Sequence, residues 1–276
     1  MDGQAEQPLN EQQPPDVQPD TVQPDTVQPD TVRPEGGQPD PRLEQLRERL
    51  AAVQERINHA VAAAGAAARP PRLIVVTKFH PAEDVRRLAA LGVTDVGENR
   101  DQEASEKAAQ LEDLGLNWHF IGQLQSKKAK SVVKYAASVH AVDREALASA
   151  LAKAMAAESE RTGRAPLECF IQVSLDDDAS AHRGGAAPGE VPALAEQLAG
   201  AAGLRLAGVM AVAPLGADPA AAFEKLAGIS GRLIEQFPDA TGISAGMSQD
   251  LEQAIRFGAT HLRIGSDILG PRPALR

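Results

Sequence analysis

The feature that most constrains the fold is a regular alternation of short apolar segments with amphipathic segments after residue 72. Eight short runs, rich in β-branched and large apolar residues, have the length and composition of buried strands. They are residues 73–77, 93–97, 118–121, 138–142, 169–174, 206–212, 241–244 and 261–264. Helical patterns fill the intervals, and several end at a glycine, as at Gly92, Gly203 and Gly258. This alternation predicts a parallel sheet covered by helices.

Eight β/α repeats within the 235 residues of 42–276 predict an α/β fold with a single (β/α)8 TIM barrel. The apolar share of 43% is sufficient for the core of one such domain. An open doubly wound sheet is the alternative. It fits less well, because no Gly-x-Gly-x-x-Gly follows the first strand. One further amphipathic helix, expected from Leu43 onwards, precedes the barrel strands.

Residues 1–41 have a different composition from the rest of the chain. The sequence Val-Gln-Pro-Asp-Thr repeats from Val17, and nine of the twenty prolines lie in this segment. With so few large apolar side chains, the segment cannot offset the entropy cost of ordering. We therefore predict a disordered acidic Pro-rich repeat tail at 1–41, and a dispensable extension is favoured over a docking or solubilising arm.

The net charge of −10 is unevenly distributed. Residues 1–41 hold nine acidic residues and one basic one, which leaves 29 acidic and 27 basic residues in the barrel region. Such a chain is not expected to bind nucleic acid or anionic lipid. No apolar run is long enough for a membrane span, and the first residues lack the pattern of a signal peptide, so a cytoplasmic location is expected. The single cysteine, Cys169, argues against a disulfide framework, and no metal site is predicted.

The first predicted strand ends in Lys78, which alternates in phase with Ile74 and Val76 and so should face the barrel interior. Functional groups of such barrels lie where strands end and the following loops begin. Desolvation at that place lowers a lysine pKa from about 10.4, which exposes the neutral amine that forms a Schiff base with an aldehyde. A lysine whose ammonium reaches solvent at the barrel rim is the alternative.

The loops after the seventh and eighth strands have the composition of an anion site. The first runs from Ser244 to Ser248 through a glycine, and Ser248 is the expected N-cap of the next helix. The second contains Gly265 and Ser266. Glycine permits a close backbone approach, helix N-termini favour anions, and barrels commonly hold phosphate in these two loops.

Three more polar residues could line the interior. Arg263 alternates with apolar neighbours and should point inward, where it needs either a carboxylate or a ligand atom as acceptor. Asn99 follows the second predicted strand, and His119 lies in the third. A helix-capping asparagine and a hydrogen-bonded core histidine are the alternatives for these two.

Six ordered motifs within residues 43–272 together resemble the pyridoxal-phosphate homeostasis protein family, also described as YggS-like or proline-synthetase-co-transcribed. They are Val-Thr-Lys78, Gly97-Glu-Asn99, Trp118-His-Phe-Ile-Gly122 with Leu124-Gln125, Gly208-Val-Met-Ala211, Ser244-Ala-Gly-Met-Ser248 and Arg263-Ile-Gly265-Ser266. Three positions depart from the family pattern. Ser266 stands where threonine is usual, Lys127 replaces the asparagine of Leu-Gln-x-Asn-Lys, and His182-Arg183-Gly184 replaces a lysine-containing version.

The resemblance implies a barrel of the alanine-racemase N-terminal type with pyridoxal 5′-phosphate (PLP) as cofactor. It implies a Schiff base between PLP and Lys78, with Asn99 near the cofactor and Arg263 facing the pyridine nitrogen. The implied phosphate contacts are Ser244, Gly246, Gly265 and Ser266.

The resemblance further implies a non-catalytic protein that buffers and delivers the vitamin B6 cofactor. PLP-dependent apo-enzymes are then the implied recipients, and the chain is expected to be a monomer or weak dimer. The alternative is a PLP-dependent racemase-like enzyme, which needs a second acid/base and normally a second, mainly β domain. The expectation is against it, since only ten residues follow Ser266, Tyr135 falls on a helix and Cys169 lies within a strand. A cofactor-free aldolase would need carboxylate or tyrosine partners at the strand ends, which the pattern does not provide.

Overall fold

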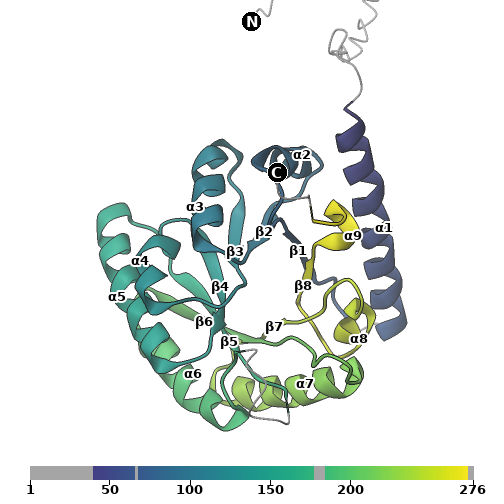
Figure 1. Ribbon diagram of the computed structural model, residues 1–276. Coiled ribbons are helices and arrows are strands. Elements are labelled where there is room, and N and C mark those ends of the chain that lie inside the picture. The colour runs from purple at the N-terminus through teal and green to yellow at the C-terminus, as the bar shows by residue number, and fades with distance from the viewer. Residues whose placement is uncertain (1–39, 66–67, 177–183, 273–276) are drawn as a thin grey trace, which may run out of the picture. The chain divides into compact units, whose positions relative to one another are not determined.

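The computed structural model describes residues 40–65, 68–176 and 184–272. Nearly all of the predicted repeat tail, and the unusual His182 and Arg183, lie outside the described residues. Eight parallel strands pair in sequence order and close into a barrel, as the ring of arrows in Figure 1 shows. The strands are β1 (Arg72–Val76), β2 (Asp95–Glu98), β3 (Asn117–Phe120), β4 (Ala136–Val142), β5 (Leu167–Gln172), β6 (Leu204–Met210), β7 (Gly242–Ser244) and β8 (His261–Ile264). The predicted barrel is therefore confirmed.

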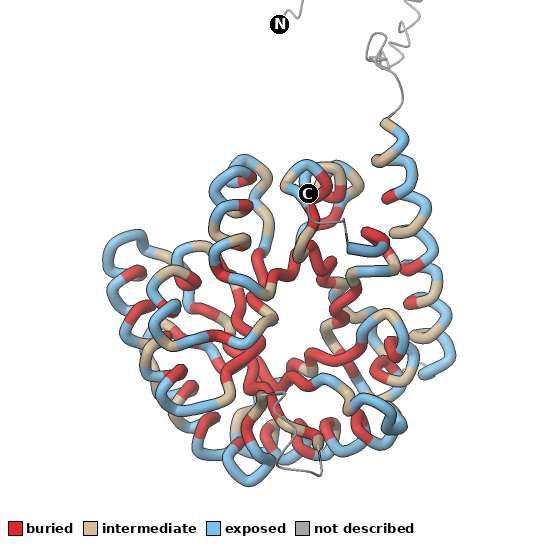
Figure 2. Tube along the Cα trace, viewed as in Figure 1, coloured by how far each residue is buried: buried red, intermediate tan, exposed pale blue. Residues whose placement is uncertain are grey.

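Helices surround the barrel on the outside. The α-helices are α1 (Pro41–Ala64), α2 (Ala82–Ala90), α3 (Asp101–Gln110), α4 (Ala129–Val132), α5 (Glu145–Thr162), α6 (Val191–Gly200), α7 (Pro219–Gln236), α8 (Leu251–Arg256) and α9 (Ser266–Leu269). The 3-10 helices are η1 (Glu112–Leu114), η2 (Ser126–Lys128) and η3 (Pro188–Glu190). Figure 2 shows the buried residues on the strands and on the inward faces of these helices.

Strand starts differ from the sequence-based prediction more than strand ends do. In the structure β5 and β6 begin at Leu167 and Leu204, two residues before the predicted starts. The second residue of each strand is charged, which hid the starts from a search for apolar runs. Glu168 and Arg205 pair with each other across the two strands, so the ion pair replaces apolar contact there.

The helical pattern between the third and fourth predicted strands covers residues 127–136, and the single helix that it predicts is wrong in extent. The chain forms only η2 and the one-turn α4, and then passes through a turn into β4 at Ala136. By contrast, α1 starts two residues before its expected first residue. Asp40 is its N-cap, and its side chain accepts hydrogen bonds from the backbone N–H groups of Arg42 and Leu43 at 2.9 and 3.2 Å. An aspartate followed by proline is a strong start signal, because proline suits the first helical position.

Helix α1 packs against α8 and α9, the two helices that follow the last two barrel loops (Figure 1). Arg56 of α1 forms ion pairs with Glu252 and Asp267, and Arg42 donates to the backbone oxygen of Leu269 at 3.0 Å. These contacts fix the loops that lead into α8 and α9. Within the described residues, no helix combines the length and the apolar content that crossing a membrane requires.

Candidate functional site

Lys78 lies in a turn directly after β1 and is half-buried. The next residue, Phe79, has φ of +69°, a conformation that non-glycine residues rarely adopt. Two side chains of α3 hold this turn. Glu103 accepts the backbone N–H of Phe79 at 2.6 Å, and the Lys107 ammonium donates to the backbone oxygen of Thr77 at 2.9 Å. The backbone on both sides of Lys78 is therefore anchored to one helix.

Lys107 also joins two carboxylates beneath the turn. Its Nζ lies 2.7 Å from Oε1 of Glu98 and 2.7 Å from Oε1 of Glu103, and the Thr77 hydroxyl donates to the same Glu98 oxygen at 2.7 Å. Burial raises the pKa of Glu98, although Lys107 opposes the shift. Sequence reasoning missed this network, since charged residues on a helix usually face solvent. The Glu103–Lys107 spacing of four was the available signal.

The turn that carries Lys78 also has a cationic surface. The guanidinium carbons of Arg272 and Arg100 lie over the ring of Phe79, 3.6 and 5.0 Å from its centroid. Arginine stacks well on aromatic faces, and among the described residues neither guanidinium forms an ion pair with a carboxylate. The surroundings of Lys78 therefore favour an anionic ligand.

Asn99 follows β2 and does not cap the next helix. The N-cap of α3 is Arg100, and the Oδ1 atom of Asn99 is buried without a hydrogen-bond partner among the described residues. Gly122 packs so closely that a Cβ there would lie 2.4 Å from the Asn99 backbone oxygen. A buried amide oxygen without a partner is costly, so Asn99 is suited to a ligand that can donate a hydrogen bond or bring a bridging water.

The loop after β7 turns through Gly246, which has φ of +92°. A Cβ there would lie 2.7 Å from the side chains of both Ala254 and Leu262. Glycine is thus required both for the backbone conformation and for the close approach of this loop to the barrel.

The predicted N-cap at Ser248 is wrong. Helix α8 begins only at Leu251, and the preceding Asp250 accepts the backbone N–H of Met247 at 2.6 Å. Ser248 is free for another contact and lies with its hydroxyl 3.2 Å from that of Ser266. The loops after β7 and β8 therefore meet at two hydroxyl groups.

Gly265 brings the loop after β8 against the end of β1. A Cβ on Gly265 would lie 3.1 Å from the backbone oxygen of Val76 and 3.2 Å from its Cβ. Strands β1 and β8 are paired neighbours, with Val75 opposite Ile264. The glycine-serine loop and Lys78 thus leave adjacent strands at the same end of the barrel.

Arg263 is buried, and neither of its acceptors is a carboxylate. It donates from Nη1 to the Ser244 hydroxyl at 2.7 Å and from Nη2 to the Ala211 backbone oxygen at 2.9 Å. Burial lowers the pKa of Arg263 to about 10. Ser244 is also buried, and its second partner is Nδ1 of His140 at 2.8 Å. Its hydroxyl is therefore engaged by two protein groups, unlike that of Ser266.

His119 is a hydrogen-bonded core histidine, the alternative considered from the sequence. Its Nε2 lies 2.9 Å from Oδ1 of Asp95 and its Nδ1 lies 2.6 Å from the Ser138 hydroxyl. Ser138 in turn lies 2.9 Å from Nε2 of His140. Asp95, Ser138 and His140 were not singled out from the sequence. Their positions on β2 and β4, in phase with other inward residues, were the available signal.

The lowered pKa of His261 predicts how the stability of the protein depends on pH. Burial lowers the pKa of His261 to about 4, whereas an unfolded chain takes up this proton near the ordinary value of 6.5. Acid therefore favours unfolding, and the stabilisation is complete above about pH 6.5 and is lost as the pH falls towards 4. Between about pH 7.5 and pH 5, we expect wild-type protein to lose about 2 kcal/mol more unfolding free energy than His261→Gln in urea titrations. Equal losses in the two proteins would contradict the assignment.

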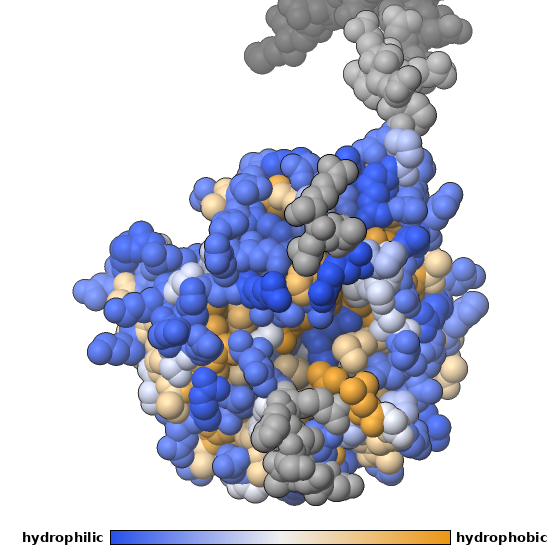
Figure 3. Space-filling model, viewed as in Figure 1, coloured by the Kyte–Doolittle hydropathy of each residue, from blue (hydrophilic) through white to orange (hydrophobic). Residues whose placement is uncertain are grey.

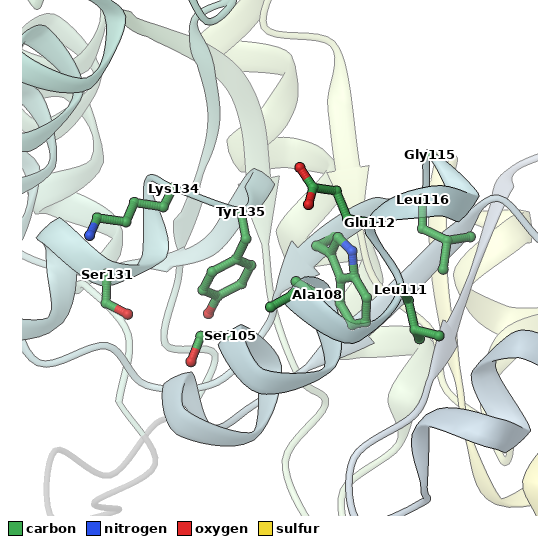
Figure 4. A pocket seen from close by; sticks show the side chains of 11 residues that line it. Ser105, Ala108, Leu111, Glu112, Gly115, Leu116, Ser131, Lys134 and Tyr135 are labelled. Atoms are coloured by element: carbon green, nitrogen blue, oxygen red, sulfur yellow. The ribbon is translucent and has the colours of Figure 1, made fainter. Parts of the chain in front are cut away.

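Tyr135 and Cys169, the two residues considered for an enzyme, are bonded elsewhere in the described part of the chain. Cys169 is buried among the apolar residues between strands and helices, and burial raises its pKa to about 12. Tyr135 lines a groove of about 550 Å³ between α3 and α4, together with Lys134 and Trp118 (Figure 4). Its hydroxyl donates to Asp101 at 3.4 Å, and burial raises its pKa. Within the described residues, neither side chain forms a hydrogen bond to Lys78 or to the loops after β7 and β8.

The entrance to the site includes apolar surface. Val212 and Leu215 after β6, and Met247 after β7, are exposed large hydrophobic residues. Figure 3 shows apolar surface near the centre of the face in view, with hydrophilic surface around it. A ligand with an aromatic ring and an anionic group would match this combination.

The fold and the site together define a barrel of the alanine racemase class, and residues 49–273 match the family model for the alanine racemase N-terminal domain. A pyridoxal phosphate homeostasis protein of Corynebacterium glutamicum is 48% identical over 204 residues, which cover 73% of this chain and 90% of that protein. This chain belongs to the pyridoxal phosphate homeostasis protein family, which confirms the resemblance seen in the six motifs.

Solved structures agree with this assignment. PipY of Synechococcus elongatus PCC7942, in a structure with PLP bound, is 34% identical with a TM-score of 0.69, and the match covers 82% of this chain and all of PipY. Alanine racemase of Corynebacterium glutamicum is 17% identical with a TM-score of 0.58, over 85% of this chain and 63% of that one. The second likeness concerns the fold alone.

Proposed function

We propose that this chain binds PLP through Lys78 and acts as a non-catalytic carrier in vitamin B6 homeostasis. The observation that carries the proposal is the placement of Lys78 beside the glycine-serine loop, with Gly265 packed against the end of β1. The names of the relatives and the PLP-bound PipY structure support the same ligand.

The residues present fit this cofactor. Gly246 and Gly265 keep the loop backbones free of side chains, and Ser248 and Ser266 add hydroxyl groups for the phosphate. The unpartnered Oδ1 of Asn99 offers a further polar contact. Arg263 keeps its Nε available for the pyridine nitrogen, because its two described bonds come from Nη1 and Nη2. Ser244, predicted as a phosphate contact, accepts a hydrogen bond from Arg263 through its hydroxyl, and its contact with phosphate stays a prediction.

When bound, PLP supplies an aldehyde that condenses reversibly with a lysine amine, with loss of one water molecule. The chain's own part is to orient Lys78, which Glu103 and Lys107 do by fixing the turn around it. A reversible bond allows both storage and release. We therefore propose that the carrier supplies PLP to PLP-dependent apo-enzymes.

A racemase-like enzyme is the second candidate, since enzymes of the same fold use PLP. Arg263 only weakens this candidate, because a guanidinium with a pKa of about 10 stays charged at neutral pH and cannot keep the pyridine nitrogen protonated as a carboxylate would, an arrangement that racemases tolerate. Tyr135 and Cys169 also form no hydrogen bond to Lys78 within the described part of the chain. Both observations favour the carrier.

Borohydride trapping tests the proposal. Purified protein incubated with PLP should turn yellow, and reduction followed by peptide mass spectrometry should place the adduct on Lys78. Lys78→Arg should abolish the adduct, because arginine cannot form the Schiff base. Lys130→Arg is the matched control, since Lys130 is an exposed lysine on α4, and it should retain the adduct. A missing adduct, or one that survives Lys78→Arg, would refute the proposal.

A second measurement separates a carrier from an enzyme. The PLP-loaded protein should not racemise alanine or serine over many turnovers, whereas it should restore the activity of a PLP-dependent apo-enzyme mixed with it. Sustained racemisation would overturn the non-catalytic assignment.

A further inference from the structure

A chain of hydrogen bonds crosses the interior of the barrel, from the first residue of β2 to the third residue of β8. Its members come from five strands and are all less than one-tenth exposed. They are Asp95, His119, Ser138, His140, Ser244 and Arg263. The two ends have fixed roles, since an ionised carboxylate only accepts hydrogen bonds and a guanidinium only donates them.

The charge of Asp95 determines which atoms donate and which accept along this hydrogen-bond chain. Burial would raise the pKa of Asp95, but hydrogen bonds from His119 and Thr94 outweigh it and leave the pKa below its ordinary value, so the carboxylate is charged. Nε2 of His119 must then carry a proton, because it faces the carboxylate at 2.9 Å, and Nδ1 is left to accept from the Ser138 hydroxyl at 2.6 Å. Ser138 has no second proton, so it accepts from Nε2 of His140 at 2.9 Å.

The direction can be worked out independently from Arg263. Its Nη1 donates to the Ser244 oxygen at 2.7 Å, and the Ser244 proton is satisfied by Nδ1 of His140 at 2.8 Å. Burial lowers the pKa of His140 well below its ordinary value, so the ring is neutral and its one proton must lie on Nε2. Both ends therefore require the same tautomer of His140. In addition, Nδ1 of His119 and Nε2 of His140 face each other at 3.1 Å and cannot both carry a proton.

We propose that Asp95, at the opposite end of the strands from the cofactor site, is a positioning residue for Arg263. Its carboxylate fixes the Nε2–H tautomer of His119 and, through Ser138, that of His140, so that Ser244 accepts from Arg263 rather than competing with it. Two of the six members, Arg263 and Ser244, lie at the site where PLP is proposed to bind, so the effect on PLP rests on the proposed function.

The opposite direction would weaken the contact to Arg263. With a proton on Nδ1 of His119, Ser138 would donate to Nε2 of His140, and Nδ1 of His140 would donate to Ser244. The Ser244 proton would then have no acceptor among the six members of the hydrogen-bond chain and would point towards other donors. Removal of the Asp95 carboxylate leaves both directions accessible.

Nitrogen NMR of the apoprotein tests the proposal without cofactor. The chain has six histidines, so single His→Gln variants can assign the ring signals. Both His119 and His140 should carry a proton on Nε2 and none on Nδ1. A proton on Nδ1 of His140, or a charged imidazolium at either position, would overturn the proposal even if PLP binds as proposed.

Variants of Asp95 extend the test to the site. Asp95→Ala should mix the tautomers of both rings and raise the dissociation constant of PLP about tenfold, the ratio for one lost hydrogen bond to a charged group. Asp95→Asn keeps an acceptor for His119 and should retain both tautomers and the affinity. His261→Gln is the matched control. The ring centroid of His261 lies 6.0 Å from that of His140, but His261 is not a member of the hydrogen-bond chain.

The outcomes separate the two proposals. Unmixed tautomers in Asp95→Ala, or an equal loss of affinity in His261→Gln, would refute the role of Asp95. If Asp95→Ala does not fold, the wild-type and Asp95→Asn tautomers still decide. Absence of a Lys78 adduct alongside the expected tautomers would refute only PLP binding.

Discussion

Gly208→Ala should lower the free energy of unfolding by about 4 kcal/mol or more, at the upper end of single-substitution effects. Gly208 lies in β6 with φ of +146°, directly opposite Gly242 of β7. A Cβ there would lie 1.9 Å from the Gly242 backbone oxygen and 2.6 Å from its carbonyl carbon. Backbone atoms in a paired strand cannot move aside as a flexible side chain can, so the β6–β7 contact must open. Urea denaturation followed by circular dichroism measures the loss.

Gly231→Ala is the matched control. Gly231 is an exposed residue within α7, and a Cβ added there would meet no atom within 4 Å outside the helix's own nearby backbone. Alanine is favoured over glycine in a helix interior, so this variant should gain up to about 1 kcal/mol. Similar midpoints for the two variants would contradict the close approach of β6 and β7.

Lys107→Met should cost about 3–5 kcal/mol, the typical penalty for removing one partner of a buried ion pair. The ammonium of Lys107 is the described cation nearest to the buried Glu98 oxygen, at 2.7 Å, and it also holds Glu103. Without it, the pKa of Glu98 should rise further and the turn that carries Lys78 should lose a hydrogen bond at Thr77. Urea denaturation at neutral pH gives the loss of stability.

Two comparisons test the cause. Lys130→Met removes an exposed lysine and should change stability by less than about 0.5 kcal/mol. Adding Glu98→Met to Lys107→Met removes the uncompensated carboxylate and should recover part of the loss. A Lys107→Met protein as stable as Lys130→Met, or no recovery in the double variant, would show that the ion pair does not stabilise the turn.

The barrel could be predicted because it follows from local periodicity. Strand period fixes which side chains share a face, and on this basis Lys78 and Arg263 were both predicted to face inward. Arg263 is buried in the structure, whereas the inward direction of Lys78 stays a prediction. The glycine positions of the last two loops were also readable. The residues that hold the Lys78 turn could not be predicted, because Glu98 and Lys107 meet only after α3 folds back on β1.

The interior hydrogen bonds were beyond sequence reasoning for the same reason. Ser244 and His140 are 104 positions apart in the chain, and no local pattern indicates that one contacts the other. The prediction of the first residue of α8 was wrong for a different reason. Both Ser248 and Asp250 are acceptable caps by residue type, and only the contact of Asp250 with the Met247 backbone decides between them.

The pairing of β1 with β8 has a consequence for the order of events during synthesis. Arg72 and His261 face each other across this seam although roughly 190 residues separate them, and contacts of such separation form slowly. Lys78 emerges early from the ribosome, but the loop that packs against the end of β1, two residues before it, does not exist until Ser266 has been made. The lysine that we propose to bind PLP is therefore made long before the loops that we propose to hold its phosphate. Under the proposed function, PLP capture follows closure of the seam rather than guiding it.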